Sequence, residues 1–328
     1  MGLGTVRFRQ MLYSIKEEMP GLWFIDLKVD GEREYSGAYV VDSGKGVALV
    51  EVGPASTYQK ILSALEDIEM VYEDVKFIFL THIHLDHAGA LGNLITHFPN
   101  ASVVVHKRGK DHLVDPDSVL WNASKRVLGF VADVYGKPKS VPEDRIIAVE
   151  KRINFELGDI SFEIVPTPGH ASHHVCIFLE REKLLFSGDA AGIYIPSLDI
   201  LLPISPPPFK FELAIRSIET MISLRPRLIA FTHFDVSKDG VQLLRKYRRQ
   251  LMIWNREIKK ILVRGVEDRG EMLDFISKRD KDLKTFLERS ESFTGIRRGV
   301  GSGLEGFLQL AMEEKRKEQL SLSDTVES

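Results

Sequence analysis

Six consecutive residues, His82-Ile83-His84-Leu85-Asp86-His87, carry three imidazoles and one carboxylate, directly after the apolar run at 75–80. A short apolar run predicts a buried strand, so the cluster is expected where that strand ends. Neutral imidazole is the commonest side-chain ligand of zinc and iron, and a carboxylate offsets the charge of a dication. His82 and His84 are two residues apart and point the same way in extended chain, so they can hold one ion together. The sequence therefore predicts a metal-dependent enzyme.

The second half of the cluster is suited to a second ion. Asp86 and His87 lie in the turn before the next helix, where they can face a position a few ångströms from the first ion. A lone histidine is more often structural than a ligand. Four ligand-type side chains in six positions make the structural interpretation the weaker one here.

Three more ligand-type residues each follow a strand-like run further along the chain. His170 follows the run at 160–165, Asp189 follows the run at 183–186, and His233 follows the run at 228–231. Together with the first cluster, this order resembles the signature of the metallo-β-lactamase-fold superfamily. The resemblance covers about residues 20 to 235. The helical pattern after it resembles the C-terminal part of glyoxalase II-like and lactonase-like members.

The resemblance implies a dinuclear site, in which two ions typically lie roughly 3.5–4 Å apart with a hydroxide between them. It implies seven protein ligands: His82, His84 and His170 on one ion, Asp86, His87 and His233 on the other, and Asp189 bridging both. We expect two divalent metal ions as the cofactor. Zinc is favoured, and iron and manganese stay open because the ligand types alone do not decide.

Hydrolysis is the expected reaction class. Two dications lower the pKa of a bridging water toward neutrality, which supplies a nucleophile without a serine or cysteine. Asp86 and Asp189 are the expected catalytic carboxylates, and the resemblance implies that Asp86 orients the hydroxide proton. We also assign Tyr194, five residues after Asp189, a hydrogen bond to the substrate carbonyl oxygen. The single cysteine, Cys176, lies in an apolar run and is expected in the core.

Other residues have two open interpretations. Members of the resembled family often carry an aspartate where this chain has Glu51. Glu51 either steadies a ligand histidine from behind or is an ordinary strand-end carboxylate. His173 and His174 either reach the outer shell of the site or cap the strand that follows. The proline-rich segment 201–209 could line an acyl pocket.

The fold expected from the resemblance is α/β, a four-layer αββα metallo-β-lactamase sandwich with a C-terminal helical subdomain. The residue patterns predict these elements: strands at 22–29, 38–42, 46–50, 75–80 and 102–106, a second set of strands at about 146–186, a strand at 228–231, and helices at 56–68, 89–97, 119–134 and 211–224. From residue 236 onward the pattern predicts helices only. We therefore expect a catalytic domain at 1–235 and a helical subdomain at 236–328.

Composition fits a globular intracellular enzyme. The chain has 328 residues, 44% of them hydrophobic, and a net charge of −3, which does not indicate nucleic acid or an anionic membrane as a partner. One cysteine cannot form an intramolecular disulfide, which fits a reducing compartment. The first 19 residues lack the apolar core of a signal peptide. We expect a cytoplasmic protein with a small-molecule substrate, no membrane association and no nucleic-acid partner, and leave a homo-oligomer open.

Two classes of reaction remain after this. The favoured one is cleavage of a small ester, thioester or lactone. The alternative is a phosphodiesterase or ribonuclease of the same superfamily, for which basic segments at 245–249 and 297–298 could contact phosphates. More often such charges form the solvated face of a helix. A metal-stabilised binding protein without turnover is a third interpretation, although a full ligand set counts against it.

Overall fold

The computed structural model of the chain describes residues 12–291 and 293–326. Residues 1–11, the first part of the segment that we expect to lack a signal sequence, lie outside the described residues. No described helix has both the length and the apolar composition needed to cross a membrane.

The first sheet mixes antiparallel and parallel strands. Within the described residues its seven strands lie in chain order: β1 (Ser14–Met19), β2 (Leu22–Asp26), β3 (Gly37–Asp42), β4 (Val47–Val50), β5 (Val75–Phe79), β6 (Ser102–His106) and β7 (Ile146–Val149). β1 to β4 pair antiparallel, and β4 to β7 pair parallel. Parallel neighbours need crossover connections, and these bring helices over one face of the sheet.

The second sheet is built from later strands. Its order in space is β15 (Val236–Lys238), β14 (Leu228–Ala230), β11 (Leu184–Phe186), β10 (Val175–Leu179), β9 (Ile160–Pro166) and β8 (Ile153–Leu157). β9 and β11 both run antiparallel to β10, and β14 runs parallel to β11. The carboxyl ends of β9, β11 and β14 therefore meet at one edge. β7 belongs to the first sheet, so the sequence pattern was wrong to group it with the second set of strands.

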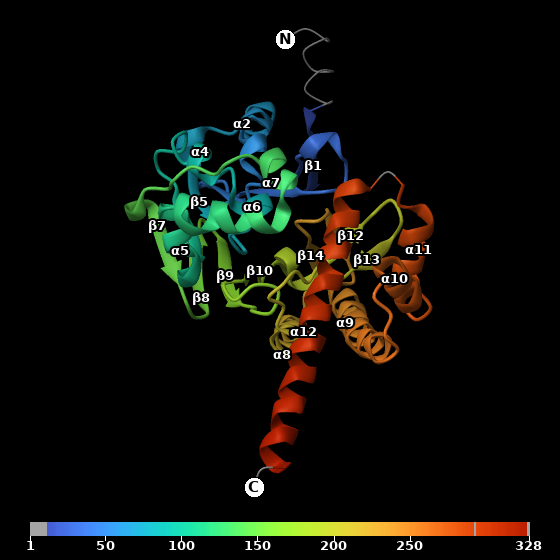
Figure 1. Ribbon diagram of the computed structural model, residues 1–328. Coiled ribbons are helices and arrows are strands. Elements are labelled where there is room, and N and C mark those ends of the chain that lie inside the picture. Colours follow the sequence, from blue (N-terminus) through green and yellow to red (C-terminus); the bar gives the residue numbers. More distant parts are fainter. Residues whose placement is uncertain (1–11, 292, 327–328) are drawn as a thin grey trace.

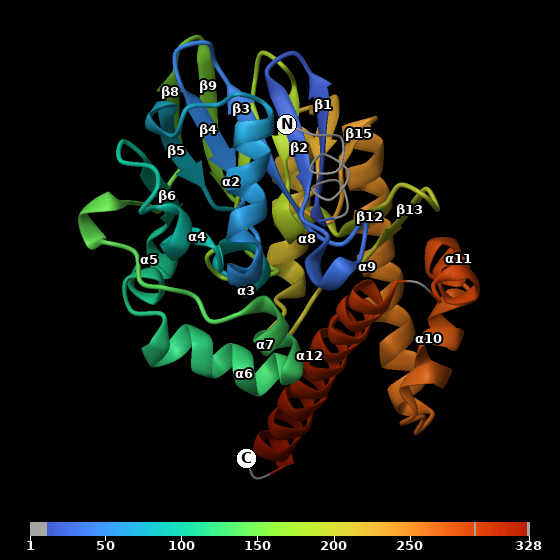
Figure 2. The same cartoon turned by 90° about the horizontal axis from the view of Figure 1, so that it is seen from above.

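Helices cover the outer face of each sheet (Figure 1, Figure 2). Over the first sheet lie α2 (Tyr58–Asp67), α3 (Leu85–Ala88), α4 (Leu91–Leu94), α5 (Lys107–Val114), α6 (Asn122–Leu128) and α7 (Phe130–Tyr135). Over the second lie α8 (Phe211–Ser223), α9 (Gly240–Val263) and α12 (Thr294–Val326), and α10 (Arg269–Ser277) and α11 (Lys281–Arg289) pack beside them. A separate hairpin is formed by β12 (Ile193–Ile195) and β13 (Ile200–Leu202). The expected αββα layers and C-terminal helical region are confirmed.

Strand alternation explains why the molecule has three apolar layers. Along β3, Val40 belongs to the same apolar cluster as Ile61 of α2. The neighbouring Tyr39 points the other way and packs against Phe186 of β11, with ring centroids 5.2 Å apart. Leu185, next to Phe186, turns toward the helices on the far side. Because successive side chains of a strand point to opposite faces, each sheet contributes to two layers.

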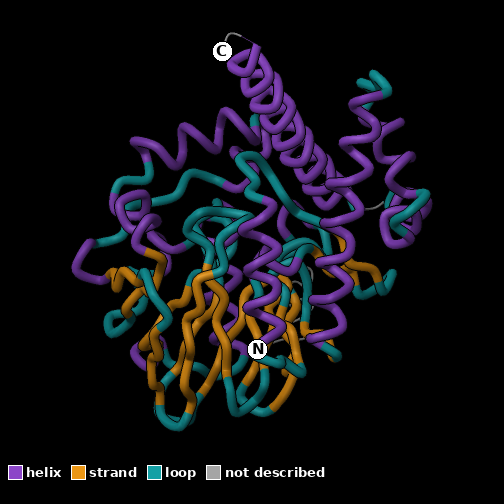
Figure 3. Tube along the Cα trace, turned by 90° about the horizontal axis from the view of Figure 1, so that it is seen from below, coloured by secondary structure: helices purple, strands orange, loops and turns teal. Residues whose placement is uncertain are grey.

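Two helices expected on the first sheet are interrupted. Within the segment at 89–97 only Leu91–Leu94 forms a helix, α4, and the preceding short helix α3 ends at Ala88. The segment at 119–134 consists of a π-helical turn at Asp117–Trp121 followed by α6 and α7. Gly129 separates these two helices with a φ of 57°, a conformation that glycine adopts without a steric penalty. Figure 3 shows the strands together at one end of the molecule, with the C-terminal helix extending beyond the opposite end.

The C-terminal region differs from expectation at one place. It is not helical from residue 236 onward, because β15 is a strand of the second sheet. The chain between 269 and 289 forms two helices, α10 and α11, and Asp280 caps the second of them. The division of the chain into a domain at 1–235 and a subdomain at 236–328 stays a prediction.

Asp280 is a buried carboxylate with an expected effect on stability. It accepts hydrogen bonds from the N–H groups at the start of α11 and from the Trp254 indole nitrogen at 2.9 Å. Asp280→Ala should lower the free energy of unfolding by about 2–4 kcal/mol, because a helix cap is lost and a buried donor is left unpaired. Urea denaturation measures this. The control is Asp268→Ala, which removes an exposed cap of α10 and should cost about 1 kcal/mol. Equal losses in the two variants would contradict the assignment.

Candidate metal centre

The structure brings all seven expected ligand residues to one edge of the two sheets. His82, His84, Asp86 and His87 occupy the loop after β5 and the short helix α3. The others follow β9, β11 and β14, whose carboxyl ends meet at that edge. The ligand atoms form two groups in which every atom lies within 4.8 Å of the others: His82, His84, His170 and Asp189 in one, and Asp86, His87 and His233 in the other.

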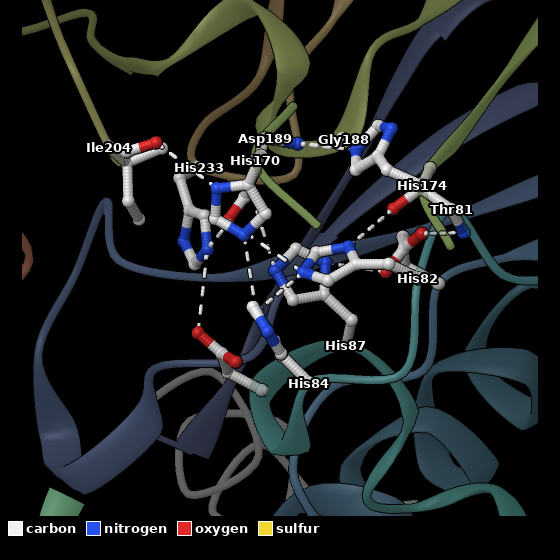
Figure 4. A network of polar contacts seen from close by, with 12 residues as sticks. Thr81, His82, His84, His87, His170, His174, Gly188, Asp189, Ile204 and His233 are labelled. Atoms are coloured by element: carbon white, nitrogen blue, oxygen red, sulfur yellow. Dashed lines mark hydrogen bonds and ion pairs between the residues drawn. The ribbon is translucent and has the colours of Figure 1, made fainter. Parts of the chain in front are cut away.

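Asp189 lies between the two groups (Figure 4). Its Oδ2 atom is 3.2 Å from His170 Nε2 and 3.9 Å from His82 Nε2. Its Oδ1 atom is 3.3 Å from His87 Nε2 and 3.6 Å from His233 Nε2. Each carboxylate oxygen thus faces a different set of imidazoles, as a carboxylate that bridges two cations must do.

The donor set fits metal ions on two grounds. First, Asp189 is only 2% exposed, and among the described residues its ion-pair contacts are all to histidines. A buried carboxylate needs a compensating positive charge. Second, three of the buried atoms make no hydrogen bond with any described residue: His87 Nε2, His233 Nε2 and Asp189 Oδ1. Buried polar atoms normally have partners, and these three converge. Imidazole and carboxylate ligands suit a divalent cation.

The histidines of the first group are in the form that binds metals. Burial and the neighbouring imidazole of His170 lower the pKa of His84 to about 3. Burial and the imidazole of His87 hold the pKa of His82 well below its usual range. Burial by itself raises the pKa of Asp189, but nearby imidazoles outweigh it and hold that pKa well below its usual value. His82 and His84 are therefore neutral near neutral pH and face an ionised carboxylate. In the second group, burial by itself lowers the pKa of His87, but the carboxylates of Asp189 and Glu51 outweigh it and hold that pKa well above its usual value.

Three histidines are oriented by acceptors on their Nδ1 side. His87 Nδ1 donates to Glu51 Oε2 at 2.6 Å, and His170 Nδ1 donates to the Ile204 carbonyl at 3.1 Å. His233 Nδ1 donates to the Tyr35 carbonyl. These acceptors place the proton on Nδ1, so that the Nε2 lone pair of each ring points into the site. Such partners set the tautomer and direction of ligand histidines.

Glu51 resolves one of the open interpretations. It is fully buried after β4, and its second carboxylate oxygen accepts the Thr81 backbone N–H at 2.6 Å. Its φ is 64°, a left-handed conformation that is uncommon for residues other than glycine. Glu51 thus ties the loop that carries His82 to the ring of His87. It is not an ordinary strand-end carboxylate.

His174 supports the site from behind, whereas its neighbour His173 does not share these contacts. The Nε2 atom of His174 accepts the backbone N–H of Asp189 at 3.2 Å, so its proton is on Nδ1. That proton faces the Thr167 hydroxyl oxygen at 2.9 Å, and the Thr167 hydroxyl also contacts the buried Cys176 sulfur. Cys176 lies in the core as expected. The His173 ring lies 6.1 Å from that of His84, and its Nε2 atom has no hydrogen-bond partner among the described residues.

Tyr194 has a different contact from the one assigned to it. Its hydroxyl donates to Asp199 in the β12–β13 hairpin at 3.0 Å, and its ring stacks on Phe231. Its backbone N–H donates to the His233 carbonyl. The hydroxyl is thus engaged within the hairpin, and contact with substrate stays a prediction.

Sequence reasoning missed Tyr35 and Ile204. Both act through backbone carbonyls, which any residue type has, so no residue-type signal marks them. The Tyr35 hydroxyl also hydrogen-bonds the Tyr135 hydroxyl at the end of α7. Burial and the nearby Asp86 carboxylate raise the pKa of Tyr35. The tyrosine pair therefore lies beside the second ligand group.

Residues 32–233 match the sequence profile of the Metallo-beta-lactamase superfamily. The metallo-beta-lactamase fold-containing protein ST1585 of Sulfurisphaera tokodaii is 30% identical over 203 residues, which are 61% of this chain and 73% of that protein. A hydroxyacylglutathione hydrolase of Salmonella arizonae is 31% identical over 153 residues, 45% of this chain and 43% of that protein. Thioesterase pkgB of Emericella nidulans is 27% identical over 154 residues, 47% of this chain and 35% of that protein. The chain spans less than half the length of the last two relatives.

Solved structures agree with this match. The crystal structure of ST1585 superposes with a TM-score of 0.59 at 26% identity, over 78% of this chain and 93% of that one. A family protein from Thermus thermophilus, TTHA1429, has a TM-score of 0.65 at 20% identity and covers 91% of this chain and 95% of its own. The second likeness shows the fold alone. From the matched profile over most of the sandwich, the chain belongs to the metallo-beta-lactamase superfamily.

Proposed function

We propose that this protein is a hydrolase that uses two divalent metal ions, with zinc favoured, to cleave a small ester, thioester or lactone. The observation that supports this best is the position of Asp189, whose two oxygens face two separate groups of ligand atoms. One group comprises His82, His84 and His170, and the other comprises Asp86, His87 and His233, with Asp189 between them. When bound, a pair of such ions supplies a water of lowered pKa and polarises the substrate carbonyl.

The protein's own residues provide the rest of the chemistry. Glu51, Ile204 and Tyr35 hold three of the histidines in one tautomer, so the ligand lone pairs are directed before substrate arrives. Asp86 is the one carboxylate of the site that is partly open to solvent, with 18% of its side chain exposed. It is therefore placed to accept or orient a proton at the mouth of the site.

The nuclease alternative needs the basic segments at 245–249 and 297–298 to bind phosphates, but arginines of both segments contact other parts of the protein. Arg248 on α9 pairs with Glu219 of α8 at 3.0 Å. Arg297 on α12 donates to the Ser290 carbonyl and lies over the Phe286 ring. These contacts favour the solvated-face interpretation over phosphate binding. Relatives named as a thioesterase and as a hydroxyacylglutathione hydrolase support acyl substrates for this chain.

Elemental analysis combined with a substrate panel tests the proposal. We expect about two metal ions per chain and faster turnover of acyl thioesters and lactones than of bis(p-nitrophenyl) phosphate. Preference for the phosphodiester would support the nuclease alternative. Bound metal without turnover of any substrate would support the non-catalytic binding interpretation.

Removal of a central ligand should remove both metal and activity. We expect Asp189→Ala and His170→Ala each to lower the metal content and abolish turnover, because each removes a charge or a lone pair that the ions need. His97→Ala is the matched control, since His97 is an exposed histidine that stacks on Tyr58 away from the site. Normal metal content with normal activity in either site variant would contradict the assignment of that residue as a ligand.

Glu51→Gln tests the residue behind His87. A glutamine has one acceptor oxygen, so it can satisfy the Thr81 N–H or the His87 Nδ1–H but not both. Loss of such a partner typically weakens metal affinity by 10–100-fold. We expect a loss within about this range in a chelator-competition titration, with the fold retained by circular dichroism. An unchanged affinity would show that His87 does not need this carboxylate.

A further inference from the structure

Helix α12 carries glycines along the face that it turns toward Tyr35 and the segment at 203–205. Four of them, Gly295, Gly299, Gly303 and Gly306, lie three or four residues apart, and this spacing places them on one side of a helix. Apolar side chains of the helix are buried in the cluster that includes α9 and α10, as Phe307 is beside Trp254. The apolar side chains of α12 thus hold the helix against its neighbours, and the row of glycines lets the helix approach the backbone of other segments closely.

Two of these glycines, Gly303 and Gly306, lie against the segment that orients His170. A Cβ atom on Gly306 would be 1.7 Å from the Ser205 carbonyl oxygen, and one on Gly303 would be 3.2 Å from the Pro203 carbonyl oxygen. Both neighbours are backbone, which cannot move aside as a flexible side chain can. Between them lies Ile204, whose carbonyl accepts the His170 Nδ1–H (Figure 4). The helix therefore lies directly against the peptide that orients a residue of the first ligand group.

The first glycine lies against the residue that orients His233. A Cβ atom on Gly295 would be 2.8 Å from the Tyr35 ring. The N–H of Gly295 donates to Glu32 at 2.7 Å, which ties the start of α12 to the chain just before Tyr35. The Tyr35 carbonyl accepts the His233 Nδ1–H. The same helix therefore supports an acceptor in each of the two ligand groups.

We propose that α12 is a positioning element of the metal centre: its glycines let it press on the backbone at 203–205 and on Tyr35, and so hold His170 and His233 in their ligating orientations. This inference rests on the proposed metal site. The glycines are positioning residues, because they act only through Ile204 and Tyr35. The far end of α12 extends beyond the rest of the molecule (Figure 1).

The test compares two identical substitutions on the same helix. Gly306→Ala adds a methyl group against the Ser205 carbonyl, whereas Gly301→Ala adds one where no atom lies within 4 Å. Both raise helix propensity alike. Metal affinity is measured by chelator competition, and the visible spectrum of the cobalt-substituted protein reports ligand geometry. We expect Gly306→Ala to bind metal about 10- to 100-fold more weakly than the parent, with an altered cobalt spectrum, and Gly301→Ala to match the parent.

Gly303→Ala serves if Gly306→Ala does not fold, since its added methyl requires a shift of only a few tenths of an ångström. Thermal unfolding of the metal-free variants separates a general loss of stability from a change at the site. Affinity and spectrum equal to those of Gly301→Ala in every folded variant would overturn the inference. A parent protein that binds no metal would instead overturn the proposed function, so the two failures are distinguishable.

Discussion

The buried carboxylate of Asp189 is the constraint on which the rest of the site depends. An ionised group removed from water is tolerated only where positive charge or several hydrogen bonds compensate it. Here the surrounding groups are imidazoles, which are neutral where burial dominates, as at His84. Metal ions between the rings and the carboxylate would supply the compensating positive charge, as the raised pKa of His87 already does in part. The surrounding structure keeps the Asp189 carboxylate and these imidazoles close together. It consists of the loops that carry them, the acceptors of their hydrogen bonds and the packed layers behind.

The acceptors behind the histidines come from different parts of the fold. Glu51 follows a strand of the first sheet, Ile204 follows the β12–β13 hairpin, and Tyr35 precedes β3. No single loop could therefore keep the site in shape on its own. The orientation of the rings depends on both sheets being packed together and on the helices that cover them. Residues far from the candidate ligands in sequence are therefore expected to affect metal binding.

The residues that converge at the candidate metal centre could be predicted from sequence, but most of the residues that support them could not. Three histidines and an aspartate within six residues after a strand are difficult to account for without a metal, so the cluster from His82 to His87 marked both the fold and the site. Glu51 had two interpretations because one carboxylate after a strand says nothing about its partner. Ile204 acts through a carbonyl, and Gly306 acts by having no side chain. The start of a new helix after Asp280 did have a sequence signal, since aspartate favours helix N-caps. The short strand β15 had none, because it has too few residues to show alternation of apolar and polar side chains.

The contact between Gly295 and Glu32 joins residues 263 positions apart in the chain, and that between His233 and Tyr35 joins residues 198 positions apart. Contacts of such long sequence separation carry a large loop-closure entropy and form slowly compared with hairpins and helices. The cluster from His82 to His87, by contrast, is local. During folding, His82, His84 and His87 therefore come near one another before their rings are fixed. If α12 positions the site as we propose, its docking is the event that completes the coordination site, and the rate of metal uptake should then depend on when that helix docks.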